Sequence, residues 1–324
     1  QAQNQKTCAR RRVGMKLVFC GTPQFAVPTL ERLAAAGYEI QLVVTQPDRP
    51  QGRGMELTAP PVKQSALKLG LPVLQPEKIK KNDEFRAQLT ALQPDAIIVV
   101  GYGRIIPPWM LELPRFGNIN VHASLLPKYR GAAPIQWAIA EGETMSGVTT
   151  MHLNEGLDTG DILLQKELPI QPEDTSITYA PPLAELGADL LVETLRGLEA
   201  QTIKPIPQDH SQATLAPILK KEDGLIDFTR TAAQIHNRLR GFQPWPGAHT
   251  QFRGKNLKFI NARPDDTPSN LAAGELRIGD EKLFVGCGQR TVLQLLQIQP
   301  EGKKALTARE FINGYHPAAS ERLG

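Results

Sequence analysis

Short apolar runs alternate with helical segments over the first half of the chain, and this alternation restricts the fold to few choices. We expect strands at 16–20, 39–45, 73–74, 96–100, 117–122 and 148–153. One helical pattern runs from Gln24 to Ala36, and another ends at Gly70. Strands that alternate with helices form right-handed βαβ units. The sequence therefore predicts an α/β domain with a mostly parallel sheet, whose ligands bind outside the carboxyl ends of the strands.

The pattern changes after Leu195. Residues 201–216 contain prolines and mixed polar residues and are typical of a linker. One helix is then expected at 232–239, with short strands at 249–252, 257–260, 282–285 and 292–296. Such strands with Gly-rich turns indicate a small β-barrel, for which an OB-like barrel is the common nucleic-acid-binding form; a β-sandwich is the alternative. We place the domains at 15–203 and 220–324, the linker at 204–219, and a leader or extension without assigned function at 1–14.

Composition excludes several classes of protein. The length of 324 residues suits two domains, and 41% hydrophobic with 22% charged residues is typical of a globular chain. The longest apolar stretch, Ala96–Val100, is far shorter than the roughly 20 residues that cross a membrane. Cys8, Cys20 and Cys287 lie far apart, which favours a reducing, cytoplasmic setting. No histidines or cysteines have metal-ligand spacing, so we expect no metal.

The charge is divided unevenly. Residues 15–203 hold 16 Lys and Arg against 21 Asp and Glu, a net charge of −5. Residues 204–324 hold 17 against 12, a net charge of +5. A basic C-terminal part suggests that it holds a polyanion while the acidic part carries out chemistry. An excess of five charges is modest, and many proteins without a nucleic-acid partner match it.

One strand carries a candidate catalytic pair. Alternate residues of a strand share a face, so Asn120 and His122 are expected side by side. Asp158 follows in the glycine-bracketed segment 156–161. An amide can stabilise an oxyanion, an imidazole can move a proton, and a carboxylate can fix the tautomer of that imidazole. These three groups suit acyl transfer to an amine.

The sequence around these residues resembles a known family. Asn-x-His-x-Ser-Leu-Leu-Pro-x-x-Arg-Gly-x-Ala-Pro at 120–134 and Gly-Leu-Asp-Thr-Gly-Asp at 156–161 resemble the motifs of the 10-formyltetrahydrofolate-dependent formyltransferases. The similarity extends from Met15 to the C-terminus. It implies a Rossmann-like formyltransferase domain followed by an OB-like tRNA-binding domain. Within the family, the chain is most similar to the members that formylate the α-amine of charged initiator methionyl-tRNA for translation initiation.

The resemblance implies roles for particular residues. Asn120, His122 and Asp158 would be catalytic. The residues that would contact the co-substrate 10-formyltetrahydrofolate follow two strands: Tyr102, Gly103, Arg104, Ile105, Ser124, Leu125, Leu126 and Pro127. Those that would contact tRNA are basic: Arg49, Arg53, Lys303 and Lys304. From the residues alone, the arginine-rich loop 46–61 could be a solvated loop, and the two lysines could form a solubilising turn. We expect a monomer.

Two local features carry their own expectations. Pro181 and Pro182 stand where the family has the first turns of a helix. Because proline is tolerated at helix starts, we expect that helix to begin near Pro181. Trp245, between two prolines, is expected to anchor the core of the C-terminal domain.

Three other functions compete. A formyltransferase acting on a small amine, such as glycinamide ribotide or an aminosugar nucleotide, would not need the basic loop and basic domain. A non-catalytic RNA-binding protein would not need Asn120, His122 and Asp158 together. A dinucleotide-dependent oxidoreductase is disfavoured because Pro23 and Ala26 occupy positions where its glycine fingerprint requires Gly.

Overall fold

The computed structural model describes residues 15–51, 56–267, 269–318 and 321–324. The expected leader at 1–14 lies outside them. The chain divides into two compact units. The first comprises the residues up to His122 together with Thr149–Gln165 and Ala184–Gln208. The second comprises Ala123–Val148, Lys166–Leu183 and Asp209–Gly324.

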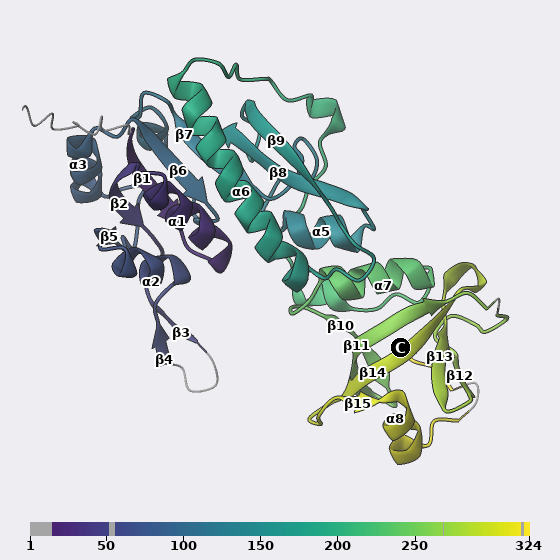
Figure 1. Cartoon of the computed structure of the whole chain (residues 1–324). Helices are drawn as coiled ribbons and strands as arrows, with labels where there is room; N and C mark the ends of the chain where they lie inside the picture. The colour runs from purple at the N-terminus through teal and green to yellow at the C-terminus, as the bar shows by residue number, and fades with distance from the viewer. Residues whose placement is uncertain (1–14, 52–55, 268, 319–320) are drawn as a thin grey trace, which may run out of the picture. The chain divides into compact units, whose positions relative to one another are not determined.

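A seven-stranded sheet organises the first unit, in the order β5-β2-β1-β6-β7-β8-β9 (Figure 1). Its strands are β1 (Lys16–Gly21), β2 (Glu39–Val44), β5 (Val73–Leu74), β6 (Ala96–Val100), β7 (Asn118–His122), β8 (Met145–His152) and β9 (Ile162–Pro169). All pairs from β5 to β7 are parallel, and β8 then runs antiparallel to β7. The predicted mostly parallel sheet is confirmed. The strands β8 and β9 contain residues of both units.

Burial on both faces explains why the central strands read as continuous apolar runs. All five residues of β6 are buried, as are five of the six in β1. Helices cover both faces of a parallel sheet, so neither face can be polar. On one face Val18 and Cys20 of β1 pack with Ile97 and Val99 of β6, together with Tyr102 from the turn beyond it.

Five of the six helices described in the sheet-bearing part of the chain begin with features that can be recognised in the sequence. The six helices are α1 (Val27–Ala35), α2 (Pro61–Lys68), α3 (Asp83–Leu92), α4 (Pro108–Leu111), α5 (Pro134–Ala140) and α6 (Ser176–Glu199), with a 3-10 turn, η1, at Gln24–Ala26. Four of them (α1, α2, α4 and α5) have a proline in their first turn, where its missing N–H costs no hydrogen bond. The α3 helix is capped by Asn82, whose side chain accepts from the N–H of Phe85 at 3.0 Å.

The predicted start of a helix near Pro181 is wrong, because α6 already begins at Ser176 and contains both prolines. Each proline removes one hydrogen bond to the carbonyl four residues earlier. Pro181, Pro182 and residues 177–178, which own those carbonyls, are all exposed, so water can satisfy the freed oxygens. The opposite side of the turn is held by Tyr179, which is buried and donates its hydroxyl to a carbonyl of β9 at 2.7 Å.

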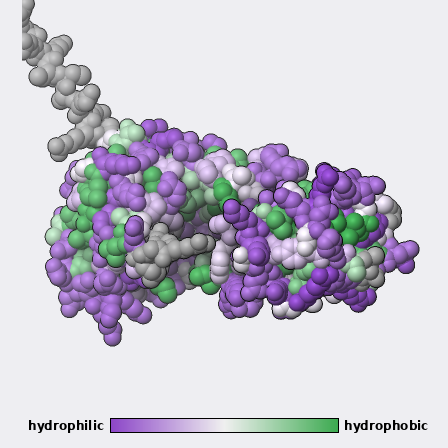
Figure 2. Space-filling view, turned by 90° about the horizontal axis from the view of Figure 1, so that it is seen from below, coloured by the Kyte–Doolittle hydropathy of each residue, from purple (hydrophilic) through white to green (hydrophobic). Residues whose placement is uncertain are grey.

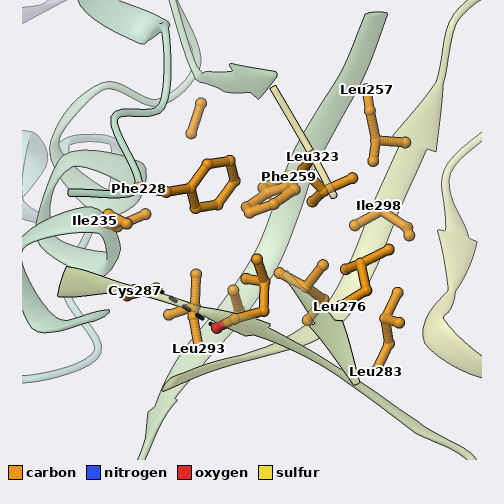
Figure 3. Close-up of a cluster of buried hydrophobic side chains, with 14 of the residues drawn as sticks. Phe228, Ile235, Leu257, Phe259, Leu276, Leu283, Cys287, Leu293, Ile298 and Leu323 are labelled. Atoms are coloured by element: carbon orange, nitrogen blue, oxygen red, sulfur yellow. Dashed lines mark hydrogen bonds between the residues drawn. The ribbon is translucent and has the colours of Figure 1, made fainter. Parts of the chain in front are cut away.

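An antiparallel sheet forms most of the second unit. Its strands are β10 (Ala248–Phe252), β11 (Lys255–Asp265), β12 (Leu276–Gly279), β13 (Lys282–Gly286), β14 (Val292–Pro300) and β15 (Leu306–Thr307). They follow the order β10-β11-β14-β13-β12, with β15 paired to β14. Figure 3 shows the aromatic and aliphatic side chains of this unit, among them Phe228, Phe259 and Leu293, gathered into one core. The predicted short strands form one antiparallel sheet in the C-terminal part of the chain, and its closure into an OB-like barrel stays a prediction.

Two capped helices accompany this sheet, α7 (Ala232–Gly241) and α8 (Ala308–Tyr315). Each starts with a capping box in which a threonine and the third helical residue exchange hydrogen bonds, the arrangement that satisfies the unpaired N–H groups of a first turn. Short 3-10 turns lie at η2 (His210–Gln212), η3 (Lys221–Gly224) and η4 (Gly288–Arg290). The expectation that Trp245 anchors this core is wrong, since this residue is 55% exposed.

The visible face in Figure 2 is mostly hydrophilic, with apolar residues scattered among polar ones. Within the described residues, no helix is both long and apolar enough to cross a membrane. Cys20 and Cys287 are free thiols buried in different units.

Candidate active site

The end of β7 places the predicted catalytic pair. Asn120 and His122 lie two residues apart on this strand and are 8% and 5% exposed. They pair in antiparallel register with Met151 and Thr149 of β8. Because side chains two apart project from the same face, the amide and the imidazole can act on one bound group. Their burial excludes most water, which strengthens any electrostatic interaction they make.

The structure brings Asp158 to His122. The distance between Nδ1 of His122 and Oδ2 of Asp158 is 3.8 Å, and the two side chains are only 6% and 13% exposed. A carboxylate facing Nδ1 favours the tautomer that carries its proton there and leaves the lone pair on Nε2. This arrangement suits an imidazole that accepts a proton during a reaction.

Asp158 itself adopts an uncommon backbone conformation. Its φ is +50°, in the left-handed region that glycine enters more readily than other residues. The loop around it is braced internally by Asn154, whose Oδ1 accepts from the N–H of Gly156 at 3.0 Å and from Oγ1 of Thr159 at 2.8 Å. Gly160 follows, where a Cβ would lie 1.9 Å from the carbonyl oxygen of His152. Because Gly160 has no Cβ, the loop that carries Asp158 can pass close to the backbone at the end of β8.

The turn after β6 contains the first set of predicted folate-contacting residues, Tyr102 to Ile105. Gly101 and Gly103 have φ of +54° and +77°, so the turn depends on residues without a Cβ. Oγ1 of Thr22 donates to the carbonyl of Tyr102 at 3.1 Å, which joins this turn to the one after β1. Tyr102 is buried, which raises the pKa of its hydroxyl. Ile105, in contrast, is 90% exposed. The turns that follow β1 and β6 are thus neighbours.

The second predicted set, Ser124 to Pro127, lies in the second unit. Ser124 and Leu126 are buried, and Oγ of Ser124 donates to the carbonyl of Lys128 at 2.7 Å. Leu125 and Pro127 instead line a cavity of about 350 Å³. The other residues of its lining are Lys128, Tyr129, Glu143, Met145, Ser146 and Gln212. Ser124 and Leu126 are therefore buried within the turn, whereas Leu125 and Pro127 line the cavity.

The predicted tRNA loop is a hairpin, with β3 at Arg49–Gln51 and β4 at Glu56–Thr58. Arg49 is exposed at its base, and Arg53 lies outside the described residues. Asp48, just before β3, accepts from Nζ of Lys63 at 2.7 Å and from Nε2 of Gln75 at 2.6 Å. These partners come from later parts of the chain, and the sequence alone did not single them out.

We expect Asp48→Asn to lower the free energy of unfolding at pH 7. Hydrogen bonds from Gln75 and Lys63 lower the pKa of Asp48 below its usual value. A carboxylate with a lowered folded pKa adds stability above its unfolded pKa, and this stability is lost as pH falls through the folded pKa. Urea denaturation at pH 7 and at successively lower pH should show the difference from wild type shrinking below about pH 4. An equal difference at every pH contradicts this assignment.

Lys303 and Lys304 lie in the second unit, in the turn after β14, and both are exposed. They are therefore accessible to a polyanion. Among the described residues, no group of three or more His, Cys, Asp or Glu side chains is arranged to hold a metal ion.

Two family models match this chain. The formyl transferase model matches residues 15–195, and the model of the formyl transferase C-terminal domain matches residues 218–316. The first of these matches includes both motifs that carry Asn120, His122 and Asp158.

Bacterial relatives are similar over nearly the whole chain. The methionyl-tRNA formyltransferase of Koribacter versatilis is 66% identical, and the match covers 96% of this chain and 99% of the relative. That of Acidobacterium capsulatum is 60% identical over 96% of this chain and 100% of the relative. That of Caldanaerobacter subterraneus is 47% identical over 93% and 97%.

Solved structures share the fold at low identity. WlaRD, a sugar 3N-formyl transferase determined with dTDP and 5-N-formyl-THF, has a TM-score of 0.65 at 18% identity, covering 90% of this chain and 99% of that one. HypX from Aquifex aeolicus in complex with tetrahydrofolic acid has a TM-score of 0.60 at 18% identity, covering 95% and 48%. These likenesses confirm the Rossmann-like class predicted for the sheet.

Proposed function

The chain belongs to the formyl transferase family, and on this premise we propose that it transfers the formyl group of 10-formyltetrahydrofolate to the α-amine of methionyl-tRNA. Relatives with 47% to 66% identity over nearly their full length carry the name of that activity. The acceptor would be the charged initiator tRNA, whose formylated methionine starts protein synthesis.

The observation that carries the proposal is the approach of Asp158 to His122, at 3.8 Å, beside Asn120 on the same strand. In formyl transfer, the amine nitrogen bonds to the formyl carbon while the bond from that carbon to N10 of the folate breaks. The proton lost by the amine must reach N10. His122 suits this proton transfer, and Asp158 stabilises the imidazolium while it exists. The amide of Asn120 donates to the formyl oxygen as charge develops there, a contribution typically worth about 3–4 kcal/mol.

The turn after β6 fits a flat ring with polar edges. Nε of Arg104 is buried and has no hydrogen-bond partner in the described part of the chain, so it can donate to an acceptor on a ligand. The exposed side chain of Ile105 offers an apolar surface to an aromatic ring. We propose that Tyr102 to Ile105, with Ser124 to Pro127, hold 10-formyltetrahydrofolate, which supplies the formyl group when bound.

The basic residues support a nucleic-acid acceptor over a small amine. Arg49 stands exposed on a hairpin, and Arg53 belongs to the same loop in the sequence. We propose that these arginines place the 3′ end of the tRNA, while Lys303 and Lys304 contact its phosphates.

We further propose that the protein works as a monomer in the cytoplasm. The free thiols Cys20 and Cys287 suit a reducing compartment. For the domains we keep the proposed division at 15–203 and 220–324. The first family match ends at residue 195 and the second begins at residue 218, which supports a domain boundary between residues 195 and 218.

Direct assay tests the proposed function. The protein should formylate charged initiator tRNA when supplied with 10-formyltetrahydrofolate, and should leave glycinamide ribotide and aminosugar nucleotides essentially unmodified. Product is measured as acid-stable formylmethionine released from the tRNA. A preference for a small amine identifies the related small-amine activity instead. RNA binding without any turnover identifies a non-catalytic RNA-binding protein.

A further inference from the structure

Gln208 is a buried residue in an exposed stretch of chain. Residues 204–207 and 209–212 on either side are exposed, yet Gln208 is only 6% exposed. It lies between the segments matched by the two family models, so it is part of neither. A polar side chain is buried at a cost unless it forms hydrogen bonds, so its environment identifies what it does.

The side-chain amide of Gln208 holds the loop that carries Asp158. Its Nε2 donates to the carbonyl of Asp158 at 2.9 Å and to the carbonyl of Gly160 at 2.6 Å. The amide has two N–H donors, and the two carbonyls on either side of Thr159 use both. All of these residues belong to the first unit.

Backbone hydrogen bonds hold the segment of Gln208 against the end of the Asp158 loop. Ile206, two residues before Gln208, exchanges hydrogen bonds of 2.8 Å in both directions with Ile162, just after the loop. Asp158 has its φ at +50°, a conformation that a non-glycine residue keeps only when its surroundings impose it. Without donors to the carbonyls of Asp158 and Gly160, the loop can relax toward a more common conformation and withdraw the carboxylate from His122.

We propose that Gln208 is a positioning residue for formyl transfer, which holds Asp158 in the conformation that faces His122; this inference rests on the proposed function. Gln208 touches neither reacting atom. It acts through two main-chain carbonyls and therefore should affect the rate of the chemical step, with little effect on how either substrate binds.

The first test replaces the amide with a side chain of similar size that cannot donate. Gln208→Leu should lower kcat about tenfold and leave KM for tRNA and for 10-formyltetrahydrofolate within about twofold of wild type. Gln88→Leu, at an exposed glutamine of α3, is the matched control for the substitution itself and should behave as wild type. A wild-type kcat in Gln208→Leu, or a loss that appears in KM alone, overturns the proposal.

A second variant separates donation from shape. In Gln208→Glu the introduced carboxylate has no donor and repels both carbonyls, whereas its protonated form regains one O–H donor. The single-turnover rate of this variant, divided by that of wild type at the same pH, should therefore rise as pH falls. The same ratio for Gln208→Leu should stay flat. A loss caused only by poor folding lowers the active fraction equally at each pH and gives two flat ratios, which overturns the proposal.

Hydrogen exchange provides a readout that needs no turnover. Amides of residues 153–161 should exchange faster in Gln208→Leu than in wild type or Gln88→Leu, while those of β6 should not change. If wild type fails to formylate tRNA but the loop still loosens in Gln208→Leu, the proposed function is wrong, and Gln208 holds the loop for another purpose. If wild type is active and the loop does not loosen, the positioning role is wrong.

Discussion

His122→Ala is expected to lower the single-turnover rate of formyl transfer about a thousandfold, because a positioned general base typically contributes 10²–10⁴ in rate. His122 is the last residue of β7 and faces Asp158, so its replacement by Ala removes the proposed proton acceptor without opening the apolar core. The rate is measured with enzyme in excess over charged tRNA. The midpoint of thermal unfolding, measured in parallel, should change little.

The partners of His122 should behave as one unit with it. Asn120→Ala is expected to lower the transfer rate about 10²–10³-fold, the usual effect of removing one donor to an oxyanion. Asp158→Ala should also slow transfer strongly. The double variant His122→Ala/Asp158→Ala should lose much less rate than the product of the two single losses. Glu155→Gln, an exposed carboxylate in the same loop, is the control and should be silent. Full activity in any of the three single variants removes that residue from the proposed site.

The strand-rich parts of the fold could be predicted because their causes lie in short segments. The runs at Lys16–Gly21 and Ala96–Val100 are apolar along nearly their whole length, as buried parallel strands must be. The alternation that placed Asn120 beside His122 likewise needs only the two-residue period of a strand. The distance between Asp158 and His122 could not be predicted from a local pattern, because the two residues are 36 positions apart in the sequence.

The features that the sequence did not predict depend on contacts between distant segments. Nothing near Gln208 in sequence indicates that it binds the Asp158 loop, since its partners precede it by about fifty residues. The same holds for Lys63 and Gln75, which anchor the base of the β3–β4 hairpin through Asp48. Two residues also depart from what their type predicts, because the degree of exposure at a site is set by distant parts of the chain.

These two residues are Pro181 and Trp245. Pro181 was expected to start a helix because proline lacks an N–H, but the carbonyl that loses its donor is exposed to water, so the helix tolerates it. Trp245, between two prolines, is predicted to anchor the core, yet it is 55% exposed. Neither outcome can be read from the residue type alone.

Changing Arg49 and Arg53 together to Ala is expected to slow single-turnover transfer to tRNA about a hundredfold, with a much smaller loss of tRNA affinity. If this hairpin places the 3′ end, its arginines orient the amine against the formyl carbon, and a misplacement of about 1 Å can cost 10²-fold in rate. For tRNA affinity, we expect each arginine to add only one of several phosphate contacts. The measurements are single-turnover rates and tRNA dissociation constants at two salt concentrations.

Lys303→Ala/Lys304→Ala is the matched control, because it also removes two positive charges but from a different turn of the chain. Phosphate contacts release counterions, so this variant should weaken binding and flatten the salt slope by about 0.7–0.9 for each lysine that binds a phosphate. At saturating tRNA its transfer rate should approach that of wild type. If the arginine variant instead loses affinity in step with rate, the hairpin is a basic surface like any other. If it loses neither, the hairpin does not touch the tRNA, because an orienting interaction cannot be removed without slowing the attack of the amine.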